Sequence, residues 1–232
     1  MRDLYDLDMA QLTDLLTEWG EPQFRAKQVW DWLYDHRVSQ FEQMSNLPKT
    51  LRARLSDETT LGTLSVATER HSRDGTVKRV YRLSDGQLIE SVLMPYRDQR
   101  RTACISSQAG CAMGCTFCAT GQMGFARHLS TTEIFEQAAV FARELAAEGQ
   151  RLSNVVLMGM GEPFHNYDNV MAAVRRLNVD LGIGARHITI STVGLAPRIR
   201  QLATEGLQVT LAISLHAATD EHRGSFMPIN RR

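Results

Sequence analysis

The stretch RTACISSQAGCAMGCTFC, residues 101–118, decides how the sequence around it is interpreted. It begins with Thr102–Ser106, a run of small and β-branched residues that predicts a strand. Three cysteines follow directly, in the spacing Cys-x3-Cys-x2-Cys. No charged residue or histidine occurs from Thr102 to Ala126, but the four glycines and many polar residues of this segment argue against a membrane helix.

Beyond this stretch the sequence alternates between predicted strands and predicted helices. Further strands are expected at Asn154–Met158, His187–Ser191 and Gln208–Ser214. Ser130 and Glu133 have the spacing of a capping box, which opens the first helix. Repeated strand–helix units predict an α/β fold with a parallel sheet, here an incomplete β/α barrel of the TIM type over residues 101–232. The functional site is expected at the carboxyl ends of the strands.

Two smaller parts are predicted before the barrel. Residues 1–58 contain three predicted helices and form a small helical module. Segment 59–100 contains three predicted strands, at Thr63–Arg70, Thr76–Leu83 and Gln87–Met94. The Asp-Gly dipeptides at 74–75 and 85–86 separate them, and tight hairpins prefer such dipeptides. These strands predict a small antiparallel sheet that links the helical module to the barrel.

Composition excludes several classes of protein. With 43% hydrophobic and 22% charged residues, the chain is neither disordered nor collagen-like as a whole. The 26 basic and 26 acidic side chains cancel, so net charge alone indicates no nucleic-acid or membrane partner. The N-terminal MRDLYDLDMA lacks the basic start and apolar run of a signal peptide, which predicts a cytoplasmic protein. Because the sequence stops soon after the fourth predicted parallel strand, leaving an open sheet edge, we expect the barrel to be incomplete at its C-terminus.

The closely spaced Cys111, Cys115 and Cys118 favour an iron–sulfur cluster. Three thiolates can ligate three irons of a 4Fe-4S cluster and leave the fourth iron open to bind and reduce S-adenosylmethionine. Zinc sites usually combine one close cysteine pair with a second pair far along the chain, and this sequence has no second pair. A zinc site completed by a histidine and a set of packed, reduced thiols remain the alternatives.

Several motifs together resemble one known family. They are CISSQAGCAMGCTFCATGQMGF (104–125), VVLMGMGEPFHNYDNV (155–170), ITISTVGL (188–195), LAISLHAATDEHR (211–223), FRAKQVWDWLY (24–34) and IESVLMP (89–95). Over nearly the whole chain, the sequence resembles the radical S-adenosylmethionine adenine C2 methyltransferases of ribosomal and transfer RNA, the RlmN family. The resemblance implies an N-terminal helical RNA-binding module joined to a partial β/α barrel.

The resemblance also assigns roles to residues of this sequence. It implies that Cys111, Cys115 and Cys118 ligate the cluster, that Glu90 accepts a proton and that Cys104 is a resolving thiol. The S-adenosylmethionine contacts that it implies are Gly161, Glu162, Ser191, Ser214, Leu215 and His216.

The mechanism of that family needs thiols outside the cluster. One S-adenosylmethionine methylates a cysteine, a second provides the radical that activates this methyl group, and a disulfide between two cysteines releases the product. The family's methyl-carrying cysteine lies in its C-terminal part, and this sequence has no cysteine after Cys118. We therefore expect the 232-residue chain to lack the methyl-carrying thiol.

The partners that the resemblance implies are 23S ribosomal RNA, transfer RNA and a reducing electron donor such as a flavodoxin, with no membrane and a monomeric state. Candidate phosphate contacts are Lys78, Arg79, Arg82, Arg97, Arg100 and Arg101, although a solvated charged face explains each of them equally well. Two other functions stay open. One is an adenine C8 methyltransferase of the same superfamily, and the other is a non-catalytic iron–sulfur RNA-binding protein.

Overall fold

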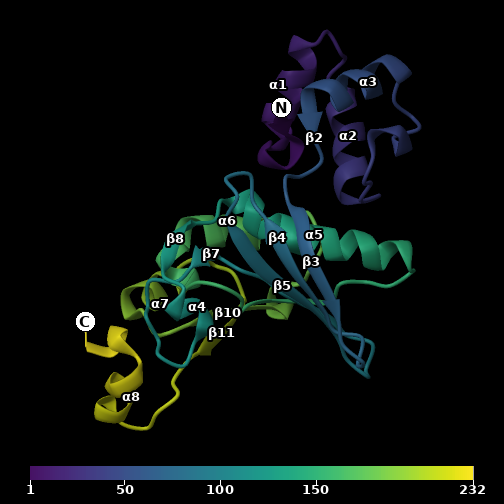
Figure 1. The fold of residues 1–232 in the computed structure, drawn as a ribbon. Helices are drawn as coiled ribbons and strands as arrows, with labels where there is room; N and C mark the ends of the chain where they lie inside the picture. The colour runs from purple at the N-terminus through teal and green to yellow at the C-terminus, as the bar shows by residue number, and fades with distance from the viewer. Residues whose placement is uncertain (232) are drawn as a thin grey trace. The chain divides into compact units, whose positions relative to one another are not determined.

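The structure is a computed structural model that describes residues 1–231. It contains two compact units, the first formed by residues 1–63 and 142–150 and the second by residues 64–141 and those from 151 onward. The elements of both are labelled in Figure 1. In the part of the chain that the structure describes, no helix is long and apolar enough to cross a membrane.

The first unit is a small helical module, as predicted. Its helices are α1 (Met9–Glu18), α2 (Phe24–Tyr34) and α3 (Lys49–Glu58), and the short strands β1 (Arg2–Asp3) and β2 (Thr59–Thr60) pair in parallel. Asp8 caps α1 by accepting a hydrogen bond from the Gln11 backbone N–H at 2.8 Å. Apolar residues at helical spacing form the core: Leu12, Leu16, Val29, Leu33, Leu51 and Leu55 are all buried.

One seven-stranded sheet organises the second unit. Its strand order is β11-β10-β9-β6-β5-β4-β3. The strands are β3 (Ser65–His71), β4 (Val77–Arg82), β5 (Leu88–Pro95), β6 (Arg101–Cys104), β9 (Asn154–Leu157), β10 (Ile188–Thr192) and β11 (Thr210–Ile213). Strands β6, β9, β10 and β11 are parallel, whereas β3, β4 and β5 are antiparallel.

This topology corrects one expectation about the sheet. The three antiparallel strands were expected to form a separate small sheet, but β5 pairs with β6 in the register Val92↔Cys104 and extends the parallel sheet. The physical reason is that β6 would otherwise present a row of unpaired backbone groups on that side. Segment 59–100, which was predicted to link the helical module to the barrel, therefore contributes β3, β4 and β5 to the same sheet as the parallel strands.

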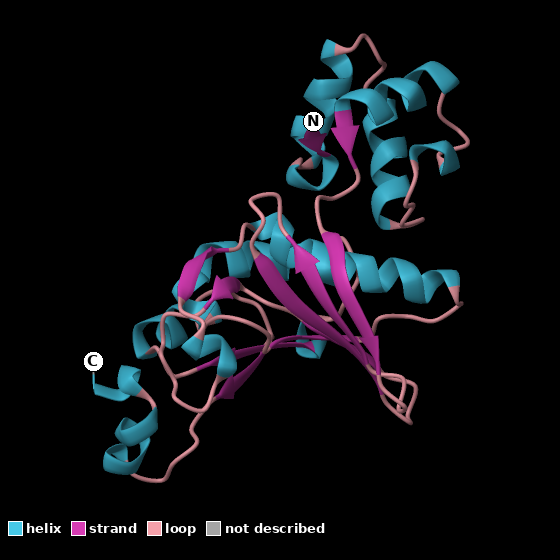
Figure 2. Ribbon diagram, viewed as in Figure 1, coloured by secondary structure: helices cyan, strands magenta, loops and turns pink. Residues whose placement is uncertain are grey.

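Helices cover one face of this sheet. They are α5 (Thr131–Ala147), α6 (Tyr167–Val179) and α7 (Ala196–Leu202), and Figure 2 shows their arrangement around the strands. Along β5, Ile89, Ser91 and Leu93 are buried, and Ser91 Oγ donates a hydrogen bond to Gln137 Oε1 of α5 at 2.6 Å. The alternate residues Glu90 and Val92 are only half-buried and point to the opposite, open face.

Four strands and helices near the cysteines were not predicted, one of which is the short helix α4 (Ala119–Gln122). Strands β7 (Gln108–Gly110) and β8 (Phe125–His128) form an antiparallel hairpin, and helix α8 spans Asp220–Phe226. The strands are short and lack alternating hydrophobicity, so their pairing depends on tertiary contacts rather than on local pattern.

Candidate functional site

The cysteine loop is the tip of the β7–β8 hairpin. Cys111 N–H donates to the Gly124 carbonyl at 2.8 Å, which closes the base of the loop. Gly110 has φ of 79°, and a Cβ at this position would lie 2.0 Å from the Gly124 carbonyl oxygen. A side chain would therefore separate the two strands, so the close approach requires glycine.

The three cysteines of this loop share one apolar environment. Cys115 is buried in a small core with Met113 and Met227, and Cys111 and Cys118 pack against that core. Burial raises the pKa of the Cys111 thiol. Burial, together with the nearby Cys118, also raises the pKa of the Cys115 thiol. The Cys111 and Cys115 thiols are therefore held neutral unless a cationic group compensates the charge of their thiolate forms.

The chemistry of this donor set suits an iron–sulfur cluster. Within residues 1–231, no three Cys, His, Asp or Glu side chains form a cage around one metal position. Three thiols on one loop beside an apolar patch are nevertheless the donors that a 4Fe-4S cluster takes, since each thiolate ligates a different iron. All four cysteines are free thiols, so no disulfide of this chain supports the disulfide step that the family resemblance implies.

Helix α8 and the segment before it hold the cysteine loop in place. Thr116 N–H donates to the Phe226 carbonyl at 3.0 Å, and the ring of Phe117 lies 4.8 Å from that of His216. Arg223 donates to the carbonyls of Val193 at 2.5 Å and Leu215 at 3.0 Å. The sequence predicts no role for Arg223, because its partners are backbone groups that only the fold brings together.

Glu162 lies at the carboxyl end of β9, as expected, and is 3% exposed. Its carboxylate accepts the backbone N–H groups of Phe164 at 3.0 Å and Val193 at 2.9 Å, and thus bridges the ends of β9 and β10. Burial raises the pKa of this carboxyl group, and the bond from Val193 opposes that shift. Gly161 has φ of 102° and packs against Gln108, where a Cβ would lie 2.5 Å from the Gln108 Cβ.

The remaining candidate contacts lie at the ends of β10 and β11. Ser191 Oγ and Ser214 Oγ are 3.3 Å apart, so the structure brings these two hydroxyls together. Leu215 is 60% exposed, and His216, whose φ is 61°, is exposed as well. Their side chains are therefore available to a ligand at the open strand ends, where α/β folds commonly bind one.

Glu90 and Cys104 project from the open face of the sheet. Cys104 lies opposite Val92, and Glu90 is two residues from Val92 on the same face. Glu90 Oε1 forms an ion pair with Lys78 Nζ at 2.8 Å, which sequence analysis did not foresee. Burial raises the pKa of the Cys104 thiol. Without a positive neighbour, this thiol is a weak nucleophile.

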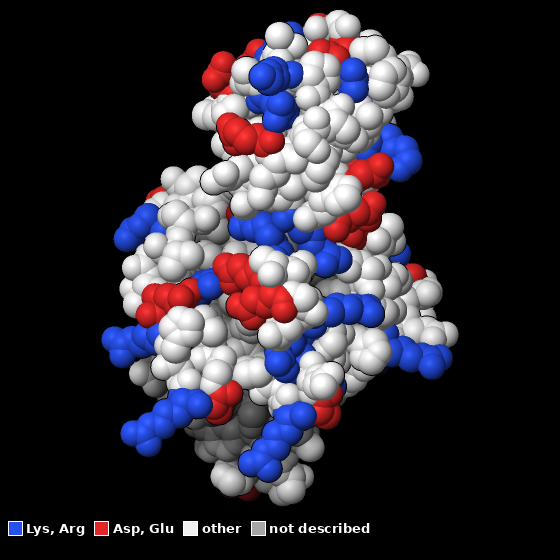
Figure 3. Space-filling model, turned by 90° about the vertical axis from the view of Figure 1, so that its right-hand side faces the viewer, with Lys and Arg blue, Asp and Glu red and all other residues white. Residues whose placement is uncertain are grey.

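The basic residues predicted as phosphate contacts differ in their burial and in their ion pairs. Arg79 is buried on the helix-covered face, where it pairs with Glu69 and lies over the ring of Phe141, so it is not available to RNA phosphates. Arg100 pairs with Asp98 at 2.7 Å. Basic and acidic side chains are interspersed on the face drawn in Figure 3. On that face the charge pattern alone therefore marks no broad phosphate-binding surface.

Gln108 is a central residue that sequence analysis missed. Its side-chain oxygen accepts the Glu162 N–H at 2.8 Å. Its Nε2 lies 3.0 Å from His128 Nδ1 and 3.2 Å from His165 Nδ1. An amide nitrogen only donates, so both imidazoles accept at Nδ1 and carry their proton at Nε2. No local pattern could have indicated this, since the partners are far apart in sequence.

Comparisons with known proteins agree with this arrangement. Residues 2–61 match the family model described as ribosomal RNA large subunit methyltransferase N-terminal domain, and residues 105–232 match that of the radical SAM superfamily. The crystal structure of a radical SAM methyltransferase from Sphaerobacter thermophilus is similar with a TM-score of 0.92 and 47% identity, covering 100% of this chain and 69% of that chain.

Two curated relatives are similar in sequence. A probable dual-specificity RNA methyltransferase RlmN from Staphylococcus carnosus is 45% identical over 99% of this chain and 64% of its own length. The protein of the same description from Halalkalibacterium halodurans is 46% identical over 98% of this chain and 63% of its own length. This chain thus spans about 64% of the length of the curated relatives that it matches.

Proposed function

This chain belongs to the RlmN family of radical SAM RNA methyltransferases, and on that basis we propose that it acts in the methylation of adenine C2 in 23S ribosomal RNA and transfer RNA. The observation that carries the proposal is the loop of Cys111, Cys115 and Cys118. This loop contacts His216, just beyond the end of β11, through Phe117, and it contacts the end of helix α8 through the Thr116–Phe226 hydrogen bond. A 4Fe-4S cluster held by these three thiols would supply the electron that cleaves S-adenosylmethionine.

The protein's own residues would bind and orient S-adenosylmethionine. The Glu162 carboxylate suits the ammonium group of the methionine part, because burial makes an ion pair there stronger than in water. Gly161 lets the backbone approach a ligand, and the Ser191 and Ser214 hydroxyls can hydrogen-bond ribose or carboxylate oxygens. Leu215 and His216 would cover the ligand from the end of β11.

The open sheet face would receive the adenine. Glu90 is the proposed acceptor of the C2 proton, and its carboxylate forms an ion pair with Lys78. Cys104 on the same face is the proposed resolving thiol. The methylation of C8 instead of C2 needs the same cluster and fold, and no specific contact in this structure favours it.

Reconstitution of the cluster tests this proposal. Anaerobically reconstituted protein should bind about four irons, and reduced protein should cleave S-adenosylmethionine to 5′-deoxyadenosine. Cys115→Ala should lose the cluster, while Cys104→Ala, a matched loss of one thiol outside the loop, should keep it. Iron analysis, visible absorption and chromatography of the nucleoside provide the measurements. One bound zinc without iron–sulfur absorption would contradict the proposal.

A further inference from the structure

A cavity of about 320 Å³ lies between the β4–β5 turn and the cysteine hairpin. Its walls are largely apolar or small, and include Leu88, Gly110, Met123, Ala126 and Met160. Met123 is 70% exposed and Leu88 is 42% exposed, so two large apolar side chains face solvent at this cavity. The proposed cluster ligands and S-adenosylmethionine contacts do not line it.

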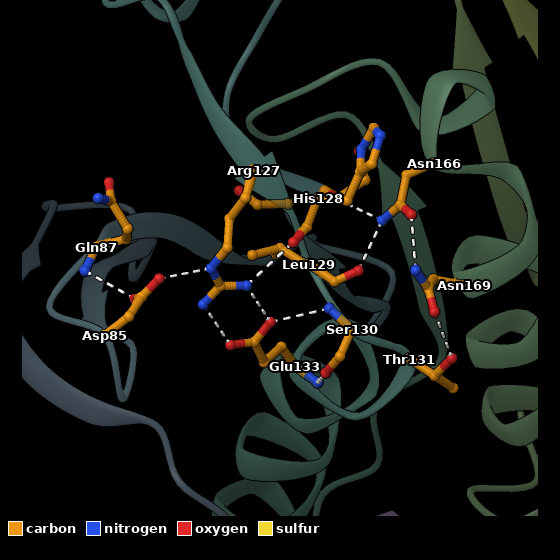
Figure 4. Close-up of polar contacts among 12 residues, drawn as sticks. Asp85, Gln87, Arg127, His128, Leu129, Ser130, Thr131, Glu133, Asn166 and Asn169 are labelled. Atoms are coloured by element: carbon orange, nitrogen blue, oxygen red, sulfur yellow. Dashed lines mark hydrogen bonds and ion pairs between the residues drawn. The ribbon is translucent and has the colours of Figure 1, made fainter.

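Arg127 fixes the two walls of this cavity relative to each other (Figure 4). Its Nε donates to Asp85 Oδ2 of the β4–β5 turn at 2.6 Å. Its two terminal nitrogens donate to the two carboxylate oxygens of Glu133, at 2.8 Å each. Glu133 in turn accepts the Ser130 N–H at 2.9 Å and so belongs to the capping box of α5. These bonds to both carboxylates raise the pKa of Arg127, which keeps the guanidinium charged.

The cavity's chemistry suits a flat aromatic ring attached to a phosphate. Methionine thioethers are polarisable and make favourable contacts with aromatic rings, and glycine and alanine leave space beside them. Arg82 lies opposite Leu88 in the β4–β5 register and therefore projects from the same face. Arg82 is exposed and has no ion pair or side-chain hydrogen bond among residues 1–231. It can therefore contact a phosphate without losing an internal partner.

We propose that this cavity is a nucleotide subsite for the RNA: an unpaired base enters between Leu88, Met123 and Met160, and Arg82 contacts its phosphate. The proposal rests on the proposed function, because it takes the bound polymer to be RNA. Glu90 lies two residues beyond Leu88 on the same strand face, about 7 Å along the strand. A base held in the cavity would thus help to position its neighbouring nucleotide near Glu90.

A cavity-filling variant provides the test. Ala126 is exposed and lines the cavity, so Ala126→Phe fills it without burying new volume in the core. The probe is a short single-stranded RNA with one 2-aminopurine, whose fluorescence reports stacking. Ala126→Phe should weaken binding about tenfold, the effect of losing one stacked base, with no change in the salt dependence. Arg82→Gln should also weaken binding, and should lower the slope of log affinity against log salt by about one.

Matched substitutions on helix α7 and at the residue directly after it serve as controls. Ala203→Phe and Arg200→Gln change exposed residues on the helix-covered side and should leave both affinity and salt slope unchanged. If wild-type protein binds this RNA and Ala126→Phe binds it equally well with the same fluorescence change, the subsite is wrong while the proposed function stands. A wild-type chain that fails to bind the RNA would contradict both.

Discussion

At the scale of single residues, the site depends on side chains that satisfy several backbone groups at once. Glu162 accepts N–H groups from two different segments, and Arg223 donates to the carbonyls of β10 and β11 ends. Gln108 is buried and connects Glu162 to two imidazoles. Both polar atoms of the Gln108 side-chain amide form hydrogen bonds. Replacing Gln108 therefore changes the hydrogen bonding and protonation of the groups around it, and not only their packing.

Gln108→Glu should therefore raise the pKa of His128. In the wild type, burial and then the nearby His165 lower this pKa, so unfolded chains take up the proton more readily. The wild-type free energy of unfolding should thus fall as pH drops through about 6.5, the ordinary histidine value. A carboxylate at position 108 would accept a hydrogen bond from His128, where the wild-type amide donates one. This favours the protonated ring, so the free energy of unfolding should rise rather than fall as the pH drops through about 6.5.

Nitrogen NMR of the histidine rings and urea unfolding at about pH 8 and about pH 5.5 measure both effects. Gln208→Glu, at an exposed position, is the control and should alter neither. An unchanged His128 titration in Gln108→Glu would mean that the amide does not set the protonation of this ring.

At the scale of elements, short turns determine where the functional side chains lie. The predicted Asp-Gly turns are present, with Gly75 and Gly86 each at φ of 84° and the Asp85 side chain accepting the Gln87 N–H at 3.1 Å. The predicted capping box of α5 is also present, since Glu133 N–H donates to Ser130 Oγ at 3.1 Å. The cysteine hairpin has no such local signal and depends on the close contact between Gly110 and Gly124.

Two alanine substitutions separate backbone strain from close contact. Gly86 and Gly110 both have positive φ, but a Cβ at Gly86 meets no atom within 4 Å. Gly86→Ala should therefore cost only the strain of a left-handed residue, about 1–2 kcal/mol. Gly110→Ala adds a clash with backbone and should lower Tm further and release the iron of the reconstituted cluster. Calorimetry and iron analysis of both variants provide the comparison, and full iron retention in Gly110→Ala would contradict it.

At the scale of the whole molecule, the sheet collects residues from distant parts of the sequence onto one open face. Glu90 comes from β5, Cys104 from β6 and Ser191 from β10, while the cysteine loop lies beyond the end of β6. Each is an isolated residue in sequence, and the strand pairings β5–β6–β9–β10 place them on one sheet. The proposed chemistry therefore belongs to the second unit as a whole.

The cysteine count leads to a prediction about turnover by the 232-residue polypeptide. It has four cysteines, and three of them are the proposed cluster ligands, so only Cys104 is left. The mechanism that the family resemblance implies uses one thiol to carry the methyl group and another to resolve the adduct. If that mechanism holds, these 232 residues alone, reduced, reconstituted and supplied with labelled S-adenosylmethionine and RNA, should form 5′-deoxyadenosine but no methyladenine. Mass spectrometry of the digested RNA measures this, and methyladenine would show that one non-cluster thiol is sufficient.

The sequence by itself determined the helices of the N-terminal module, the alternation of parallel strands and helices, and the grouping of three cysteines, because caps, Asp-Gly turns and close cysteine spacing act within a few residues. Only the tertiary structure decided that β3–β5 extend the parallel sheet, that Lys78 pairs with Glu90 and that Arg79 faces the helices. It alone joined Gln108 to Glu162 and built the cavity beside Arg127. These contacts link residues far apart in the chain, and their geometry depends on strand register, which local sequence patterns do not encode.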